Sequence, residues 1–400
     1  MDALLSALLL QAGYNTALVS IGAALLGASA GAIGTFVLLR KRSLVTDAIS
    51  HATLPGLGLA FLVMALAAGD GRWMPGLLVG AALSAGLGLL AVVWITRRTR
   101  LTEDVAIGAV LSVFFGLGVV LLTVIQSLNT GGQAGLSGFL LGSTAGMLRS
   151  EAETIAVAAA ITGLAVFLLR RPFTLVCFDQ DYAATRGINV RAVDLAMMGL
   201  VLAVTVIGLK VAGLVLIVAL TIIPPVAARF WTNRPDRMVV IAASLGAAAA
   251  YGGAVISALG EGLPTGALIV LLAFALFLLS LIFSPVRGVM AGSYARFLLR
   301  KRVHERQGLL ALARGEPIYD PLTMRVLRRA GYVRGDGVPS LEGRAAAAAA
   351  VRDEALWDLY RRLFPAEAAN VEYQGLIPIG QALPPDMVAD LEARLAPKGA

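Results

Sequence analysis

Long apolar runs recur through the first 290 residues of this chain. A bilayer core about 30 Å thick is crossed by a helix of about 20 apolar residues. Nine runs of that size occupy residues 14–39, 44–68, 76–96, 104–128, 151–169, 192–209, 211–230, 238–259 and 265–284. The two runs on either side of Lys210 are short and almost continuous, so the sequence predicts an all-α polytopic membrane protein with eight or nine transmembrane helices.

The charged residues divide the 400-residue chain into two parts. Asp, Glu, Lys and Arg make up only 14% of the sequence, against about 25% in soluble domains, and they gather after residue 290. We therefore predict a transmembrane domain over residues 1–290 and a small water-exposed domain over residues 291–400. The chain has one cysteine, Cys177, which excludes an intrachain disulfide and argues against a thiolate metal cluster.

Basic residues flank alternate apolar runs, which predicts the orientation of the chain. Of the 17 Lys and Arg residues before position 290, 14 fall on one side of this arrangement, and only Arg72, Arg149 and Lys210 fall on the other. Cytoplasmic loops are the ones enriched in Lys and Arg. The sequence thus predicts an external N-terminus and a cytoplasmic tail, and it explains the net charge of +8 without a nucleic-acid partner.

Small residues recur at helical spacing along the first run. Gly22, Gly27, Gly31 and Gly34 allow helix backbones to approach closely in a membrane. We predict that these glycines are helix-packing positions rather than the lining of a pore.

Two ionisable residues open the second run. Asp47 and His51 are four residues apart, so on a helix they share one face. Ionisable groups inside membrane helices are costly and point to function. A carboxylate with an imidazole suits Mn(II), Zn(II) or Fe(II) better than Cu(I), although the same spacing also fits an Asp at a helix entrance that bonds a nearby His.

Two ligands are too few for a selective site. A second copy of the chain across a two-fold axis would supply another Asp47 and His51. Glu261, between the last two runs, could attract cations or contact a binding protein, or could be an ordinary loop acid.

Four segments, in order, resemble the family of permeases in ABC importers for manganese, zinc and iron. They are TFVLLRKRSLVTDAISHATLPGLGLAF (35–61), CFDQDYAATRGINV (177–190), GLVLIVALTIIPPVAARF (213–230) and LPTGALIVLLAFALFLLSLIFSPVRG (263–288). The resemblance covers nearly all of residues 10–290 and places the inward-facing acid and histidine of the family on Asp47 and His51.

The resemblance implies a multi-pass permease subunit in a bacterial cytoplasmic (inner) membrane, paired with a second copy or a paralogue. Two separate ATPase subunits would hydrolyse ATP, an extracytoplasmic binding protein would deliver the metal, and the chain would be neither an enzyme nor the holder of a permanent cofactor. No Walker-type loop occurs in the sequence. The coupling helix of the family falls on Asp179, Gln180, Asp181, Tyr182, Ala183, Ala184, Thr185, Arg186 and Gly187.

The tail resembles the winged-helix part of iron- and manganese-dependent repressors. The sequence predicts a basic helix over 294–314, a helix over 320–332, a hairpin turn over 335–343 and an alanine-rich helix over 344–364. The ligand stretch of the repressors is replaced by VEYQGLIPIGQALPPD, in which only Glu372 and Asp386 are acidic. We expect a docking or regulatory tail that binds neither metal nor nucleic acid.

Two other classes of function compete with the importer. A stand-alone secondary metal transporter or channel would need no ATPase, but the match to the coupling helix and the scarcity of other charges within the spans argue against it. A membrane-tethered regulator would need a DNA-reading tail, and the degenerate tail argues against that.

Overall fold

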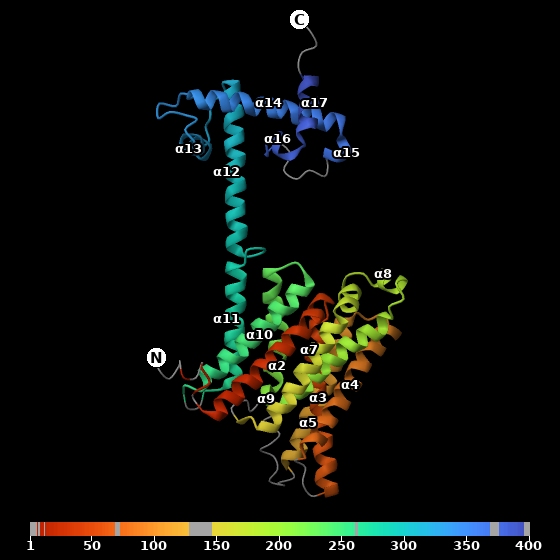
Figure 1. The fold of residues 1–400 in the computed structure, drawn as a ribbon. Coiled ribbons are helices and arrows are strands. Elements are labelled where there is room, and N and C mark those ends of the chain that lie inside the picture. The colour runs from red at the N-terminus through yellow and green to blue at the C-terminus, as the bar shows by residue number, and fades with distance from the viewer. Residues whose placement is uncertain are drawn as a thin grey trace. The chain divides into compact units, whose positions relative to one another are not determined.

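The structure is a computed structural model that describes residues 6, 9–11, 13–68, 73–127, 146–260, 263–368 and 376–395. The chain divides into two compact units, Met1–Val289 and Met290–Ala400, each described by itself. The regular secondary structure of the described residues is helical (Figure 1).

The first unit contains the membrane-spanning helices. They are α2 (Tyr14–Leu39), α3 (Ser43–Ala68), α4 (Met74–Arg98), α5 (Glu103–Ser127), α7 (Arg149–Phe178), the short α8 (Gln180–Thr185), α9 (Val190–Trp231), α10 (Pro235–Ser257) and α11 (Thr265–Phe283). Nine stretches of the described residues are long and apolar enough to cross a membrane, because α9 holds two, Val190–Leu209 and Ala212–Trp231. Of the two span numbers that the sequence left open, the structure supports nine.

The two spans of α9 meet at Gly213. This residue has φ 74° and ψ 169°, a conformation that favours glycine because it has no Cβ. A Cβ on Gly208 would lie 2.8 Å from the Ile217 Cδ1 atom, whereas nine residues of a continuous helix extend about 13.5 Å. The chain therefore turns sharply between the sixth and seventh spans.

Helix α2 is the most deeply buried span, and its glycines explain why. A Cβ on Gly27 would lie 2.3 Å from the Gly246 carbonyl oxygen of α10, and a Cβ on Gly31 would lie 2.4 Å from the Ala242 carbonyl oxygen. On the other flank, a Cβ on Gly34 would lie 2.1 Å from a carbonyl oxygen of α9. The prediction that the glycines of the first span are packing positions is confirmed.

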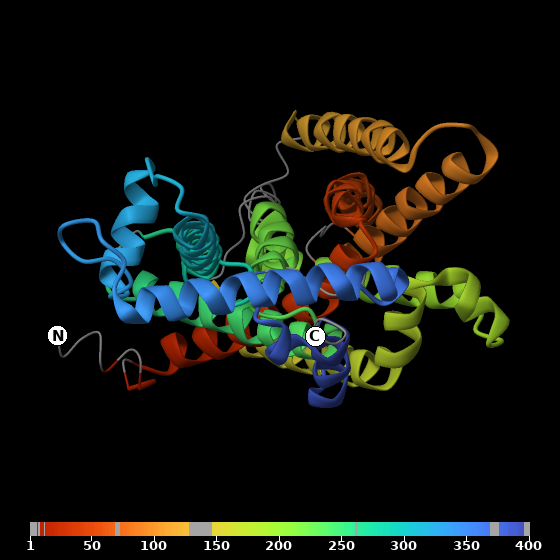
Figure 2. The same cartoon turned by 90° about the horizontal axis from the view of Figure 1, so that it is seen from above.

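Helices α4 and α5 lie beside α3 at one flank of the unit (Figure 2). α7 and α11 leave most of their apolar surface exposed, as helices do where they face lipid. The buried interior instead consists mainly of residues of α2, α3 and α9.

The second unit consists of α12 (Val289–Arg314), α13 (Pro321–Arg329), α14 (Leu341–Leu363), α15 (Pro365–Ala368), α16 (Ile379–Ala382) and α17 (Pro385–Leu395). Its core surrounds Trp357, which is fully buried and donates a hydrogen bond from Nε1 to the Ile377 carbonyl oxygen at 3.0 Å. The first helix begins five residues before the predicted start at 294. The expected hairpin contains one isolated β-bridge, between Val333 and Pro339, in this part of the structure.

Candidate metal site and the ion pairs beside it

Asp47 and His51 lie on one face of α3, as their spacing predicts. The His51 Nε2 atom is 3.4 Å from the Asp47 Oδ1 atom, and the two side chains are 26% and 37% exposed. Both groups thus point to the same open side of the helix, where one cation could contact the carboxylate and the imidazole together.

The rest of this end of α3 is enclosed by protein. The hydroxyl side chains of Thr46, Ser50 and Thr53 are fully buried there, whereas Ser43 at the first position of the helix is half-buried. The Ser50 hydroxyl donates to the Thr46 carbonyl oxygen at 2.9 Å, and the Thr53 hydroxyl donates to the Ser50 carbonyl oxygen at 2.5 Å. The exposed strip therefore consists of Leu44, Asp47 and His51, and only its last two members are ionisable.

The His51 ring has two different surroundings. Its Nδ1 atom is buried and has no hydrogen-bond partner among the described residues. The ring makes a T-shaped contact with the Phe115 ring of α5, with centroids 5.0 Å apart. The Nε2 atom is the nitrogen that faces Asp47. Pro55, one turn later, has no N–H to donate to the His51 carbonyl oxygen, which loses its usual helical partner.

A complete ligand set is not formed by the described part of this chain. No group of three or more His, Cys, Asp and Glu side chains that could hold a metal ion occurs there. Within the described residues the pair supplies two donors, one carboxylate and one imidazole. Glu261, the proposed outer-loop contact, lies outside the described residues.

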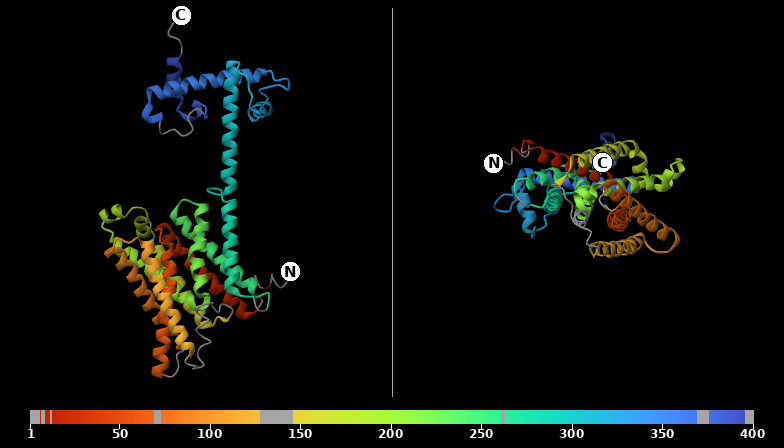
Figure 3. Two further views of the ribbon diagram at one scale, coloured as in Figure 1. Left: turned by 180° about the vertical axis from the view of Figure 1, so that it is seen from behind. Right: turned by 90° about the horizontal axis from the view of Figure 1, so that it is seen from below.

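The segment proposed to couple to an ATPase forms a short capped helix between α7 and α9. The Asp179 side chain accepts a hydrogen bond from the Tyr182 backbone N–H at 2.8 Å, and Gly187 ends the segment with φ 79°. Only Ala183 is buried; the other members of the segment, Asp179, Gln180, Asp181, Tyr182, Ala184, Thr185, Arg186 and Gly187, are exposed. This polar helix stands at one end of the unit, where a partner could reach it (Figure 3).

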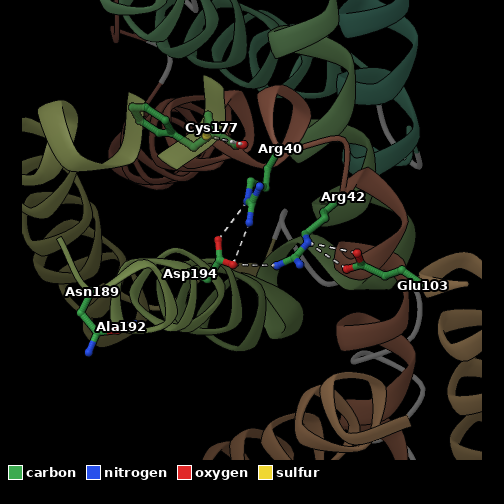
Figure 4. Close-up of polar contacts among 8 residues, drawn as sticks. Arg40, Arg42, Glu103, Cys177, Asn189, Ala192 and Asp194 are labelled. Atoms are coloured by element: carbon green, nitrogen blue, oxygen red, sulfur yellow. Dashed lines mark hydrogen bonds and ion pairs between the residues drawn. The ribbon is translucent and has the colours of Figure 1, made fainter. Parts of the chain in front are cut away.

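An ion-pair network lies next to this segment (Figure 4). The Arg40 guanidinium makes two hydrogen bonds of 2.9 Å to the Asp194 carboxylate of α9. Arg42 reaches the same carboxylate at 3.5 Å and Glu103 of α5 at 2.9 Å. The hydrogen bond to Asp194 raises the pKa of Arg40 above its ordinary value.

The network joins elements that are far apart in the sequence. Arg40 and Arg42 belong to the tight turn between α2 and α3, in which Lys41 adopts a left-handed conformation with φ 60°. The Gln180 amide of α8 faces Arg40 and, with its oxygen turned toward the guanidinium, accepts hydrogen bonds from it. α2, α3, α5, α8 and α9 are thereby connected at one end of the unit.

Sequence reasoning missed this network. It assigned Arg40 and Arg42 to orientation alone and did not single out Asp194 or Glu103. One signal was present: Asp194 is a carboxylate inside the predicted span 192–209, where an ionisable residue needs a partner.

Comparison with known proteins covers the first unit. Residues 14–284 match the family described as "ABC 3 transport family". The chain is 41% identical over 298 residues to the manganese transport system membrane protein MntC of Bacillus subtilis, covering 74% of this chain and 67% of that protein. It is 36% identical over 277 residues to the zinc transport system membrane protein TroC of Treponema pallidum, covering 69% and 91%.

A solved structure shares the arrangement of helices. PsaBC from Streptococcus pneumoniae in complex with Fab is similar with a TM-score of 0.60 and 28% identity, covering 70% of this chain and 95% of that one. The family match begins with α2 and ends just after α11. It therefore includes Asp47, His51 and α8, and leaves the second unit outside.

Proposed function

From the finding that this chain belongs to the ABC 3 transport family, we infer that it is the membrane-spanning permease subunit of an ABC importer for a divalent transition metal ion. Relatives named for manganese, zinc and iron transport support this class of cargo. Manganese, zinc and ferrous iron all accept carboxylate and imidazole ligands, so the donor types do not separate these three ions.

The observation that carries the proposal is the Asp47–His51 pair on the open strip of α3. A divalent ion in a membrane needs replacements for its water ligands, since its transfer into hydrocarbon is prohibitively costly. One chain offers a carboxylate and an imidazole there. A second permease chain that faces this strip across a two-fold axis would double the set to two carboxylates and two imidazoles, or add the equivalent groups of a paralogue.

We further propose that ATP is hydrolysed by separate subunits that dock on α8. This helix is short, polar and exposed between two spans, which suits insertion into a groove of a partner. A push on α8 would reach Arg40 through Gln180 and then the turn that leads into α3. The ion pairs of Arg40 and Arg42 would transmit the movement because charge-assisted, bidentate hydrogen bonds hold their geometry well.

Release of the ion requires that the same groups separate. Transport sites bind strongly enough to admit an ion and weakly enough to let it leave. We propose that relative movement of the two permease chains pulls the two α3 strips apart and divides the four donors. An extracytoplasmic binding protein would load the site from the other face.

The second unit is proposed to be a cytoplasmic docking or regulatory domain with a winged-helix-like arrangement. The order of α12, α13, the bridged turn and α14 supports the winged-helix-like arrangement. The cytoplasmic location is supported by the basic residues that gather in the loops on the same side of the first unit as α8. We assign it no role in nucleic-acid binding.

The direct test is uptake of radioactive manganese or zinc by cells or vesicles that contain the assembled importer. Asp47→Ala and His51→Ala are expected to lower uptake at least about a hundredfold, at unchanged amounts of permease in the membrane. Asp47→Asn should fail almost as badly, because it preserves the shape of the side chain and removes the negative charge.

Two controls separate a specific site from general damage. Asp104→Ala removes an exposed carboxylate near the start of α5, and Val63→Ala shortens an exposed apolar side chain of α3 outside the strip. Both variants should transport at the wild-type rate. Wild-type uptake by both alanine variants of the pair would sink the assignment, and uptake that persists without ATP or the ATPase would favour a stand-alone transporter.

A further inference from the structure

The face of α12 formed by Met290, Tyr294, Phe297 and Leu298 is apolar and exposed. These residues follow the spacing i, i+4, i+7 and i+8, so they form one stripe along the first half of the helix. Tyr294 and Phe297 are 65% and 61% exposed. A stripe of large apolar side chains that faces water is costly and marks a contact with another surface.

In the second half of α12, the same face of the helix is covered by α13. Gly308 continues the same stripe, and a Cβ there would lie 2.7 Å from side-chain atoms of Leu327 and Thr323 in α13. His304 is 3.0 Å from the Asp320 carboxylate at the start of α13. The stripe is therefore packed from His304 onward and uncovered before it.

Basic residues flank the uncovered half. Arg296, Arg300, Lys301 and Arg302 lie within or next to it, and no acidic residue occurs between Val289 and His304. None of these four forms an ion pair within the described parts of the chain, whereas Arg306 and Arg314 farther along the helix pair with Asp353 and Glu354. Arg296 donates a hydrogen bond to the Gly292 carbonyl oxygen of its own helix at 3.2 Å. The first half of α12 thus combines an uncovered apolar stripe with basic residues whose charges no carboxylate of the described residues neutralises.

We propose that the first half of α12 binds the surface of the membrane, with its apolar stripe among the acyl chains and its basic residues on anionic phospholipid headgroups. Only five residues separate the end of α11 from the start of α12, so these turns emerge at the membrane face where the ninth span ends. A helix with an aromatic and aliphatic face bordered by Lys and Arg is the type that lies in a bilayer interface. Cytoplasmic leaflets supply the matching negative charge.

The test uses the full-length protein in lipid vesicles, with a nitroxide label at position 297. In a Cys177→Ala background, Phe297→Cys places the label on the stripe, and Ala295→Cys places it about 200° around the same helix as a matched control. Electron paramagnetic resonance then compares collisions with oxygen, which enriches in lipid, and with a water-soluble nickel chelate. Vesicles contain phosphatidylcholine alone or with phosphatidylglycerol.

We expect the label at 297 to favour oxygen in vesicles that contain phosphatidylglycerol, and the label at 295 to favour the nickel chelate. Arg300→Gln and Lys301→Gln should each lower the equilibrium constant for binding of the first half of α12 to the bilayer surface about fivefold. Added salt should also lower this constant, because it screens the attraction to the headgroups. The idea is overturned if position 297 is as accessible to nickel as position 295 in both lipids. It is equally overturned if position 297 is shielded from both reagents, which would mean that protein covers the stripe, or if shielding arises only after the ATPase is added.

Discussion

Helices α3 and α11 are both long enough to cross a membrane, yet protein covers very different shares of their surfaces. Protein covers 56% of the most apolar window of α3 and 17% of that of α11. α11 carries no charged residue, and its two hydroxyl side chains, Thr265 and Ser280, are both buried while Leu271 and Phe274 are exposed. α3 keeps Thr46 and Ser50 buried and turns Asp47 and His51 to its open strip.

The difference follows from lipid as the solvent. Lipid tails are as apolar as leucine, so exposing a leucine of α11 to lipid costs little free energy. Polar groups, by contrast, need hydrogen-bond partners that only protein provides within the bilayer. We therefore expect that the Asp47 carboxylate on the open strip of α3 contacts another protein chain, an ion or water rather than lipid in the working protein. Single substitutions in packed, lipid-facing and polar exposed surfaces can test how each kind of surface contributes to folding and transport.

The largest effect is expected where backbones touch. Gly27→Leu forces side-chain atoms into the Gly246 carbonyl region of α10, where even a Cβ has no room, so little folded protein should reach the membrane. Gly163→Leu on α7 is the matched control, since nothing lies within 4 Å of a Cβ there. The yield of each variant after detergent extraction and size-exclusion chromatography measures how much folded protein reaches the membrane. Equal yields of the two variants would contradict the close packing of α2 on α10.

A smaller but direct comparison uses leucines of α3 and α11. Leu57→Ala, at a fully buried position, should cost about 2–5 kcal/mol of unfolding free energy because a cavity remains. Leu271→Ala, on the exposed side of α11, should cost less than about 1 kcal/mol because lipid fills the space. Unfolding in rising mole fractions of SDS measures both. A reversed order would mean that α11 is covered by a partner.

α8 shows a third kind of surface, polar and exposed. Gly187→Leu should cost about 1–2 kcal/mol locally, because φ is positive there, and should lower metal uptake several-fold while ATP hydrolysis continues. Gly187→Asn is the milder control, since asparagine tolerates that conformation better. Uptake and hydrolysis are measured on the same reconstituted complex. Full uptake with leucine at this position would argue against docking of the ATPase on α8.

The smallest signal is expected from a topology reporter. Alkaline phosphatase fused after Ala400 should be inactive, because the basic residues place the end of α11 on the cytoplasmic face together with the start of α3. The same enzyme fused to a chain truncated after Trp73, beyond the other end of α3, should be active. Activity after Ala400 would reverse the proposed sides of the membrane.

Much of the first unit could be predicted from local sequence. Hydropathy located nine candidate spans, with the division near Lys210 left open, and glycine spacing along α2 predicted its packing. The segment that forms α8 was expected from the resemblance to the permease family. The sharp turn at Gly213 was harder, because the apolar run is nearly continuous and the turn depends on one backbone conformation. The Arg40–Asp194 pair, 154 residues apart, and the Phe115 ring on His51 depend on tertiary contacts that no local pattern encodes.

The contact of Gly27 with Gly246 has a mechanical consequence. Two helices whose backbones are in contact cannot slide or rotate against each other without steric clashes. We therefore expect α2 and α10 to move together as one rigid body. Arg40 to Arg42, between α2 and α3, are only three residues long and are held by ion pairs. We expect this short turn to act as a hinge, about which the candidate metal site on α3 moves while α2 and α10 keep their positions.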